Sequence, residues 1–287
     1  MATSERSEGE PSFTPTRAPS FARGLLELDA AQVGAHRGVL AELFEDRRVG
    51  LVVHGAVAPE ACARLVDTLT RSTPVAPDAM KHFDGQCFGP TLIVWEEALD
   101  RYLEAAQGAT EALARVTGIP ATIDAILSQL AGLPVSAPPA PDGRAYCPAN
   151  VRMLRPDSGI ALHCENETTG FPPMRELIER IDTTTQLSFY VLLQAPEAGG
   201  ELRIEPLREG EPSGAPLRSL PRDEPAVLRA LDRLEAIVPP MRAGDLLVFD
   251  AGRHYHRVMP VRGARPRWTL GAFVARSKDH LRLWHWS

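Results

Sequence analysis

The chain has 287 residues, a formal net charge of −6, 44% hydrophobic residues and 24% charged residues, which is the composition of a globular protein with a sizeable core. No apolar run reaches the roughly 18 residues of a membrane span and the N-terminal residues lack the apolar centre of a secretory signal, so we expect a cytoplasmic protein without a membrane partner. The acidic balance provides no general phosphate-neutralising surface, so nucleic acid is not expected as a partner.

The N-terminal half reads as a tail followed by a largely helical region. The first residues are rich in Ser, Pro, Glu, Thr and Arg without periodicity, so we expect a disordered tail over 1–22 and a single domain over 23–287. Within that domain, residues 23–132 are predicted to be helical around one short strand, GLVVHG. Apolar residues recur at helical spacing over 62–69 and 123–130, and a third helix is expected over about 99–117.

The Pro-rich stretch over residues 133–148 changes the character of the chain. Short apolar segments that suit strands follow it: NVRML, GIALH, QLSFYVLL, GELRIEP, DLLVFD, HRVMPV and RWTLGAFVA. Many short strands with few helices between them predict an antiparallel sandwich or jelly roll. Two interruptions are expected, a helix at PPMRELIERI and a polar insertion over about 207–236 whose second half has a helical pattern.

Two separated segments supply metal-ligating residue types. In GIALHCENE, His163 and Glu165 are two residues apart, and alternate side chains of a strand share a face, so both groups can bind one ion. About ninety residues later the chain supplies His254 and His256. Two imidazoles and one carboxylate on one face of an octahedral ion leave three positions open, a ligand set that suits non-haem Fe(II). An isolated HxE pair is common without a metal, so the prediction depends on its context.

The order of motifs around the HxE pair provides that context. After it come QLSFYVLL, a GGEL turn, GDLLVFD, HRVMPV and RPRWTLGAF. This order resembles the Fe(II)/2-oxoglutarate-dependent oxygenases over about residues 145–280. The resemblance implies an α+β fold with a double-stranded β-helix (jelly-roll) core over 145–280, flanked by helices mainly from the N-terminal half. It also implies Fe(II) as the metal, 2-oxoglutarate as the cosubstrate and O2 as the oxidant.

A narrower resemblance concerns one branch of these oxygenases. The segments LAGLPVSAPPAPDGRAYCPANVRML, QLSFYVLLQAPEAGGELRI, GRHYHRV and FVARSKDHLRLWHWS are similar to those of the cyanobacterial hapalindole and welwitindolinone-type aliphatic halogenases. Those halogenases have a glycine where this chain has Glu165, and the missing carboxylate leaves room for chloride on the iron. The resemblance therefore implies the halogenase scaffold with the ligand set of a hydroxylase.

The resemblance also assigns site residues. His163, Glu165 and His256 match the metal ligands; His254 competes with His256, which we prefer because it stands first in the HxVxPV pattern. Arg267 is expected to bind the far carboxylate of 2-oxoglutarate through two parallel hydrogen bonds, and Arg265 is expected to share its face. Ser188 stands where the related halogenases have a serine near the iron, so its hydroxyl is expected to orient a bound ligand. Tyr190, two positions further on, is expected to reach a carboxylate of the cosubstrate; a core tyrosine is the alternative.

These assignments imply an enzyme that hydroxylates an unactivated C–H bond of a small molecule, expected by analogy to be a natural product, while 2-oxoglutarate is decarboxylated to succinate. A free amino acid or a carrier-bound acyl group is the main alternative substrate. Halogenation, desaturation or ring closure on the same scaffold are alternative reactions. A zinc hydrolase with the same three ligands and a non-catalytic jelly-roll binding module are further alternatives. The sequence leaves the oligomeric state open.

Overall fold

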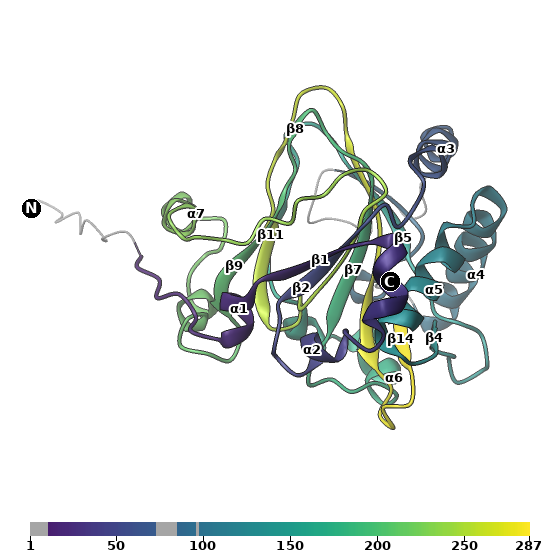
Figure 1. The fold of residues 1–287 in the computed structure, drawn as a ribbon, viewed down its shortest axis with the longest axis horizontal. Coiled ribbons are helices and arrows are strands. Elements are labelled where there is room, and N and C mark those ends of the chain that lie inside the picture. The colour runs from purple at the N-terminus through teal and green to yellow at the C-terminus, as the bar shows by residue number, and fades with distance from the viewer. Residues whose placement is uncertain (1–10, 73–84, 96–97) are drawn as a thin grey trace, which may run out of the picture.

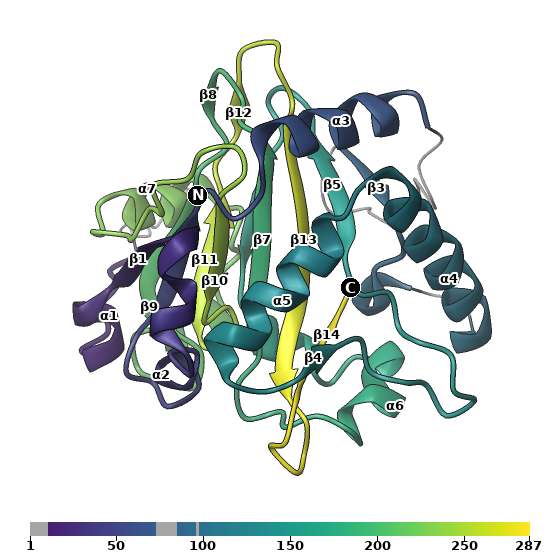
Figure 2. The same ribbon diagram turned by 45° about the vertical axis from the view of Figure 1, so that its right-hand side comes forward.

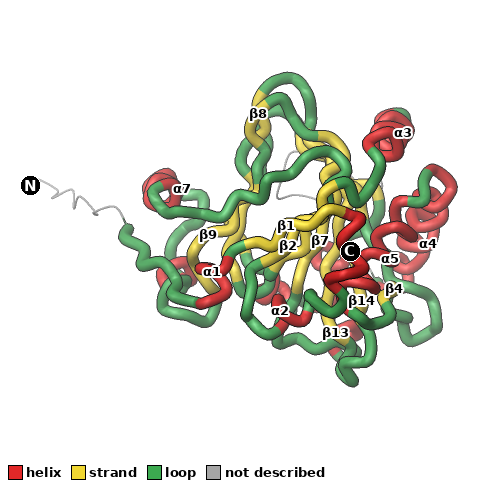
Figure 3. Tube along the Cα trace, in the orientation of Figure 1, coloured by secondary structure: helices red, strands yellow, loops and turns green. Residues whose placement is uncertain are grey.

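A computed structural model describes residues 11–72, 85–95 and 98–287 (Figure 1). The strands of these residues form a nine-stranded sheet, a three-stranded sheet and a two-stranded ribbon. Strands occupy the middle of the molecule, and the longer helices lie along one side of it (Figure 3). Residues 1–10 of the expected tail lie outside the described residues.

The large sheet is organised around its longest strand. Its main run, in spatial order, is β1 (Leu25–Asp29), β2 (Gly50–His54), β10 (Leu246–Phe249), β7 (Leu187–Gln194) and β13 (Arg267–Arg276). One edge of β13 pairs with β7. Its other edge pairs first with β5 (Asn150–Leu154) and then with β14 (Leu283–Trp286). β3 (Gly85–Phe88) extends the sheet beyond β5, and β4 (Val135–Ser136) extends it beyond β14.

The small sheet faces the large one. It has the order β6 (Ile160–His163), β11 (His254–Val258) and β9 (Leu202–Arg208), all antiparallel. The ribbon of β8 (Ala198–Gly199) and β12 (Val261–Arg262) projects beyond both sheets (Figure 2). The seven strands expected after residue 148 are therefore confirmed.

Side-chain alternation along the strands separates two apolar layers. In β10, Leu246 and Val248 belong to a core cluster shared with the helices, whereas Leu247 and Phe249 belong to a cluster shared with the small sheet. Successive side chains of a strand point to opposite faces, so one face of the large sheet packs on helices and the other on β9 and β11. The candidate site lies between the two sheets.

Three helices cover the outer face of the large sheet: α3 (Pro59–Thr70), α4 (Leu99–Val116) and α5 (Ile119–Ala131). They confirm the three helices expected from apolar periodicity. α5 buries Ile123, Leu127 and Leu130 and ends at Gly132, whose φ of 69° is the left-handed conformation that favours glycine at a helix end. Figure 2 shows α5 crossing the outer side of β7 and β13.

The expectation of a largely helical region over residues 23–132 needs correction. The one expected strand, GLVVHG, is present as β2. In addition, β1 pairs with β2 in parallel at one end of the large sheet, and β3 joins the sheet near its other end. The remaining helical elements there are short: η1 (Ala30–His36), α2 (Ala41–Phe44) and η3 (Leu92–Val94). β14 also joins this sheet. The large sheet therefore contains strands from before residue 145 and from after residue 280, outside the core expected over 145–280.

The described part of the expected tail packs on the domain. Phe13 is buried, the backbone N–H of Thr16 donates to Pro206 O at 2.6 Å, and α1 (Pro19–Arg23) follows. Residues 11–22 are thus ordered on the domain, in contrast to the expected disorder.

The two interruptions in the strand region contain shorter helices than the patterns suggest. The first holds η5 (Pro172–Met174) and α6 (Arg175–Ile178). The second begins within β9 and holds η6 (Ala215–Arg218) and α7 (Pro225–Asp232). In Figure 1, α7 lies on the side of the molecule opposite to α3, α4 and α5.

Candidate metal centre

Two histidines meet on neighbouring strands of the small sheet. His163 ends β6 and His256 lies in β11, and the antiparallel register places them directly opposite each other. Cross-strand partners in such a pair have side chains close together on one face. Their ring centroids are 4.2 Å apart. Sheet pairing thus brings together two residues that are 93 positions apart in the sequence.

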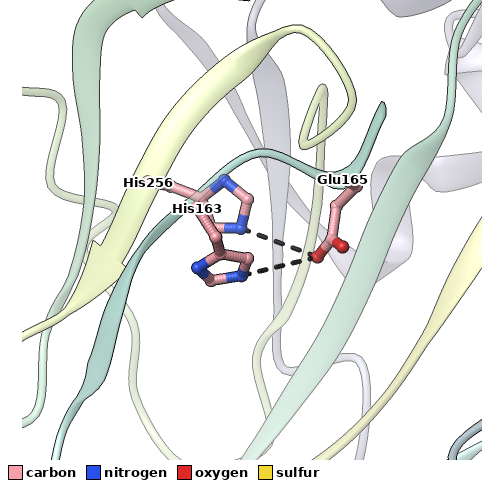
Figure 4. A group of neighbouring side chains, drawn as sticks. All are labelled: His163, Glu165 and His256. Carbon is pink, nitrogen blue, oxygen red and sulfur yellow. Dashed lines mark ion pairs between the residues drawn. The ribbon is translucent and has the colours of Figure 1, made fainter. Parts of the chain in front are cut away.

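Glu165 completes the group from a short turn. It is the first residue of η4 (Glu165–Thr168), which follows β6, and its backbone N–H donates to Ala251 O at 2.9 Å. Its Oε1 lies 3.7 Å from the Nε2 of both His163 and His256 (Figure 4). The carboxylate is 7% exposed, so its charge is largely removed from water.

The outer ring nitrogens of both histidines are held by backbone carbonyls. His163 Nδ1 donates to Ala161 O at 2.7 Å, and His256 Nδ1 donates to His254 O at 2.9 Å. A proton on Nδ1 leaves the lone pair on Nε2, which is the nitrogen that faces Glu165. Both imidazoles are therefore oriented as metal ligands.

The charges of the three groups depend on one another. Burial alone would raise the pKa of the Glu165 carboxyl, but the two imidazoles beside it lower this pKa well below its usual range. Burial and the neighbouring His163 lower the pKa of His256, whereas Glu165 overcomes burial and raises the pKa of His163. The group is therefore an ionised carboxylate with two imidazoles, and metal binding competes with a proton at His163.

The donor set fits a divalent ion such as Fe(II). The ligand atoms of His163, Glu165 and His256 lie within 4.8 Å of one another. Ligands at about 2.1 Å from a metal on adjacent octahedral positions are about 3 Å apart, so a small rotation of the side chains suffices. Two histidines and one carboxylate occupy three positions and leave the others for exogenous ligands.

The facing wall of the pocket is supplied by the large sheet. The pocket that contains the three candidate ligands is also lined by Ser188 and Tyr190 of β7 and by Arg267 of β13. Arg267 is 5% exposed, and its guanidinium lies 5.1 Å from the centre of the Tyr190 ring. Burial lowers the pKa of Arg267. Within residues 11–72, 85–95 and 98–287 no carboxylate forms an ion pair with it, so this buried cation is available to an anionic ligand.

Comparison with protein-family models supplies the remaining observation. Residues 22–287 match the model described as "Carrier-protein-independent halogenase WelO5". The chain belongs to the WelO5 family of Fe(II)/2-oxoglutarate oxygenases. The expected cofactors, Fe(II) and 2-oxoglutarate, are confirmed. A search of curated proteins found no match.

Two crystal structures of an N-substituted L-amino acid dioxygenase from Burkholderia ambifaria AMMD are similar to this WelO5-family chain. One matches with a TM-score of 0.53 and 17% identity, covering 89% of this chain and 91% of the other. The second, a complex with alpha-KG, matches with a TM-score of 0.55 and 16% identity, covering 85% and 89%. Together they show the mixed α+β fold of a 2-oxoglutarate oxygenase.

In this WelO5-family member, one of the two candidate arginines and one of the two candidate histidines line the pocket, and the other member of each pair does not. Arg265 is exposed, donates to Pro196 O at 3.1 Å and does not line the pocket, so the expectation that it shares the face of Arg267 needs correction. His254 is fully buried, and its ring nitrogens lack a hydrogen-bond partner among the described residues. It lies near Asp46 and Asp250 and outside the pocket, which supports the preference for His256.

A second basic residue of this pocket, Arg152, received no predicted role from the sequence. Arg152 of β5 lines the same pocket, and its Nε donates to Asn150 Oδ1 at 3.2 Å. In the part of the chain that the structure describes, no carboxylate is ion-paired with it. Only the alternation of Arg152 with Asn150 on a strand next to β13 signals this placement, and an arginine on a solvated strand face has the same pattern.

Ser188 and Tyr190 lie in the pocket as expected. The Ser188 hydroxyl is buried without a hydrogen-bond partner among the described residues, and burial raises the pKa of Tyr190. The Ser188 hydroxyl is therefore free to bond a ligand in the pocket, whereas Tyr190 contacts the Arg267 guanidinium. Separately, none of the described helices is long and apolar enough to span a membrane.

Proposed function

We propose that this protein hydroxylates an unactivated C–H bond of a small molecule while 2-oxoglutarate is converted to succinate and CO2. The observation that carries this proposal is the position of Glu165, whose carboxylate lies 3.7 Å from both Nε2 atoms. A third protein ligand of the proposed metal centre would lie at this position. In the halogenases that the sequence resembles, glycine at this position leaves room for chloride. Here the carboxylate fills that room.

Each residue has a defined task in this proposal. His163, Glu165 and His256 hold Fe(II), which with 2-oxoglutarate and O2 supplies the oxidising power. Arg267 binds the far carboxylate of 2-oxoglutarate, because a buried guanidinium can donate two parallel hydrogen bonds to it. Tyr190 covers this guanidinium, and the Ser188 hydroxyl donates to a ligand in the pocket. The two facing sheets form the double-stranded β-helix core of the proposed enzyme.

The family description keeps halogenation as the second candidate function, because it names a halogenase. On that alternative Glu165 would have to leave the metal so that chloride could bind. Its carboxylate is instead buried and points at both imidazoles (Figure 4). A zinc hydrolase is disfavoured because it has no need for the buried, unpaired cation at Arg267.

The substrate is proposed to be a small natural product. Support comes from the resemblance to halogenases of such compounds and from the carrier-protein independence in the family description. The structural relative from Burkholderia ambifaria AMMD is named for N-substituted L-amino acids. We therefore include amino-acid derivatives among the compounds to be tested.

The decisive experiment is product analysis under competing conditions. The protein is incubated with Fe(II), 2-oxoglutarate, O2 and an excess of chloride, and compounds that increase succinate release are identified. We expect the product to gain one oxygen atom by mass spectrometry. We expect Glu165→Gly to lose this oxygenated product, because it removes a metal ligand. A chlorinated product from the wild-type protein, or undiminished alcohol formation by Glu165→Gly, would contradict the proposal.

A further inference from the structure

The backbone of the turn that carries Glu165 is hydrogen-bonded to the connection between β10 and β11. Glu165 N–H donates to Ala251 O at 2.9 Å and Asn166 N–H donates to Gly252 O at 3.3 Å. The two segments approach so closely that only glycine fits at position 252, because an added Cβ would overlap with Asn166 Oδ1. These contacts fix the backbone of the turn against the connection from β10 to β11. They do not fix the far end of the turn.

A charged clamp holds that far end. Glu167, two residues after Glu165, accepts hydrogen bonds from both terminal nitrogens of Arg222, at 2.7 Å from Nη1 and 2.6 Å from Nη2. The Tyr255 hydroxyl donates to the same carboxylate at 3.0 Å, and the Arg222 guanidinium lies 5.1 Å from the centre of the Tyr255 ring. Bidentate charge-assisted pairs of this kind combine strength with directional specificity.

Arg222 reaches this turn from the segment between η6 and α7, the polar insertion of the sequence analysis. Its Nε also donates to Leu217 O at 3.4 Å. The insertion is seated by an apolar cluster in which Leu217, Val227 and Leu231 pack with Cys164 and Tyr255. Both partners of Glu167 are therefore held by packing. Arg222 belongs to the packed insertion, and Tyr255 is buried next to the proposed ligand His256.

We propose that Arg222 is a positioning residue for the metal centre. Acting through Glu167, it holds the turn so that the Glu165 carboxylate points at the two imidazoles. The turn needs such support because a 3-10 turn has few internal hydrogen bonds of good geometry. A glutamate side chain also has one more rotatable bond than an aspartate. The insertion thus acts on the metal site rather than only on substrate entry; this inference rests on the proposed metal ligands.

Cobalt(II) binding to the metal-free protein tests the proposal without turnover. Groups hydrogen-bonded directly to metal ligands change affinity by about 10–100-fold, and Arg222 acts one step further away, through Glu167. We expect Arg222→Gln to weaken Co(II) binding by about the lower limit of this range and to shift the d–d absorption spectrum towards that of Glu165→Gln. Arg222→Lys, which keeps the charge but loses the bidentate geometry, is expected to lie between Arg222→Gln and wild type.

Matched controls separate positioning from a general loss of stability. Arg218 belongs to the same insertion and forms an ion pair with Glu209 at 3.2 Å, but its side chain is 58% exposed. Arg218→Gln should leave Co(II) affinity and spectrum unchanged. Tyr255→Phe removes one hydrogen bond from Glu167 without changing charge and should shift the spectrum slightly in the same direction as Arg222→Gln. The midpoint of urea unfolding of each metal-free variant shows whether it folds.

The outcomes distinguish this inference from the proposed function. If Glu165→Gln leaves Co(II) binding unchanged, the ligand assignment itself is wrong. If Glu165→Gln weakens binding but folded Arg222→Gln and Tyr255→Phe both bind like wild type with the same spectrum, the positioning role is overturned. Weakened binding with the shifted spectrum in Arg222→Gln, together with unchanged Arg218→Gln, is the result expected from the structure.

Discussion

Arg265 and Arg267 are two residues apart, yet only Arg267 faces the pocket. Side chains at i and i+2 share a face only within a strand, and β13 begins at Arg267. Arg265 lies before that point, in the connection from β12, where alternation does not apply. Of the two arginines that the sequence offered, the structure places only Arg267 in the pocket where we propose that 2-oxoglutarate binds.

This distinction predicts different kinetic effects for the two arginines. Removing a hydrogen-bonded charge from a buried carboxylate site costs about 1.5–3 kcal/mol, which corresponds to about 10–150-fold in affinity. We expect Arg267→Gln to raise the KM for 2-oxoglutarate by this factor. Arg265→Gln should change it less than about twofold, because an exposed side chain outside the pocket contributes little. Steady-state succinate release measures both values, and equal effects of the two substitutions would contradict the assignment.

At this scale the sequence predicted which three side chains cluster, His163, Glu165 and His256, better than it predicted their surroundings. Motif order distinguished His256 from His254, and the structure shows why alternation alone does not: the pairing of β11 with β9 is irregular between these two residues. The Nδ1 partners Ala161 and His254 are backbone carbonyls, which leave no mark in a sequence. Arg222 lies 55 residues from Glu167, and no local pattern connects them.

At the scale of elements, strands were predictable where turn residues punctuate them. All seven strands expected after residue 148 are present, because Gly, Pro and Asp bound short apolar runs there. β1 was missed because LLELD lacks a clear alternation, and its parallel pairing with β2 has no tight turn as a local signal. β3 and β14 have only four residues each. These strands form through contacts with the large sheet rather than through a pattern of their own.

The end of β2 carries a pH-dependent contact between elements. His54 Nδ1 lies 3.0 Å from Asp245 Oδ2, and its Nε2 lies 3.0 Å from Glu27 Oε2 of β1. These two hydrogen bonds, the one to Asp245 first, raise the pKa of His54. A histidine whose pKa is higher in the folded state stabilises that state fully below its unfolded value of about 6.5. The stabilisation is lost as the pH rises through the folded value.

We therefore expect His54→Gln to lower the free energy of unfolding more at a pH of about 5.5 than at a pH of about 9. Urea denaturation of wild type and variant at both pH values measures this difference. Comparing the two proteins at each pH cancels the contributions of the other titratable groups. A loss of stability that is the same at both pH values would show that the ionic part of the contact contributes nothing.

At the scale of the whole molecule, the site depends on the packing of two sheets, each of which lines one wall of the pocket. The small sheet carries two of the proposed ligands, His163 and His256, whereas the large sheet carries the cations Arg152 and Arg267. The apolar contacts of Leu247 and Phe249 with β9 and β11 keep these walls apart at a fixed distance. The resemblance over residues 145–280 implied two packed sheets. Of the N-terminal strands that extend the large sheet, β2 was expected from the sequence, whereas β1 and β3 were not.

In the proposed function, His163, Glu165 and His256 bind one Fe(II), to which 2-oxoglutarate adds. Anaerobic titration of the metal-free protein with Fe(II) and 2-oxoglutarate tests it directly, because the bound pair gives a weak visible charge-transfer band. We predict a band that saturates at one Fe(II) per chain, disappears in His256→Ala and persists in His280→Ala, whose histidine is 53% exposed. Absence of the band from the wild-type protein, or its persistence in His256→Ala, would contradict the account.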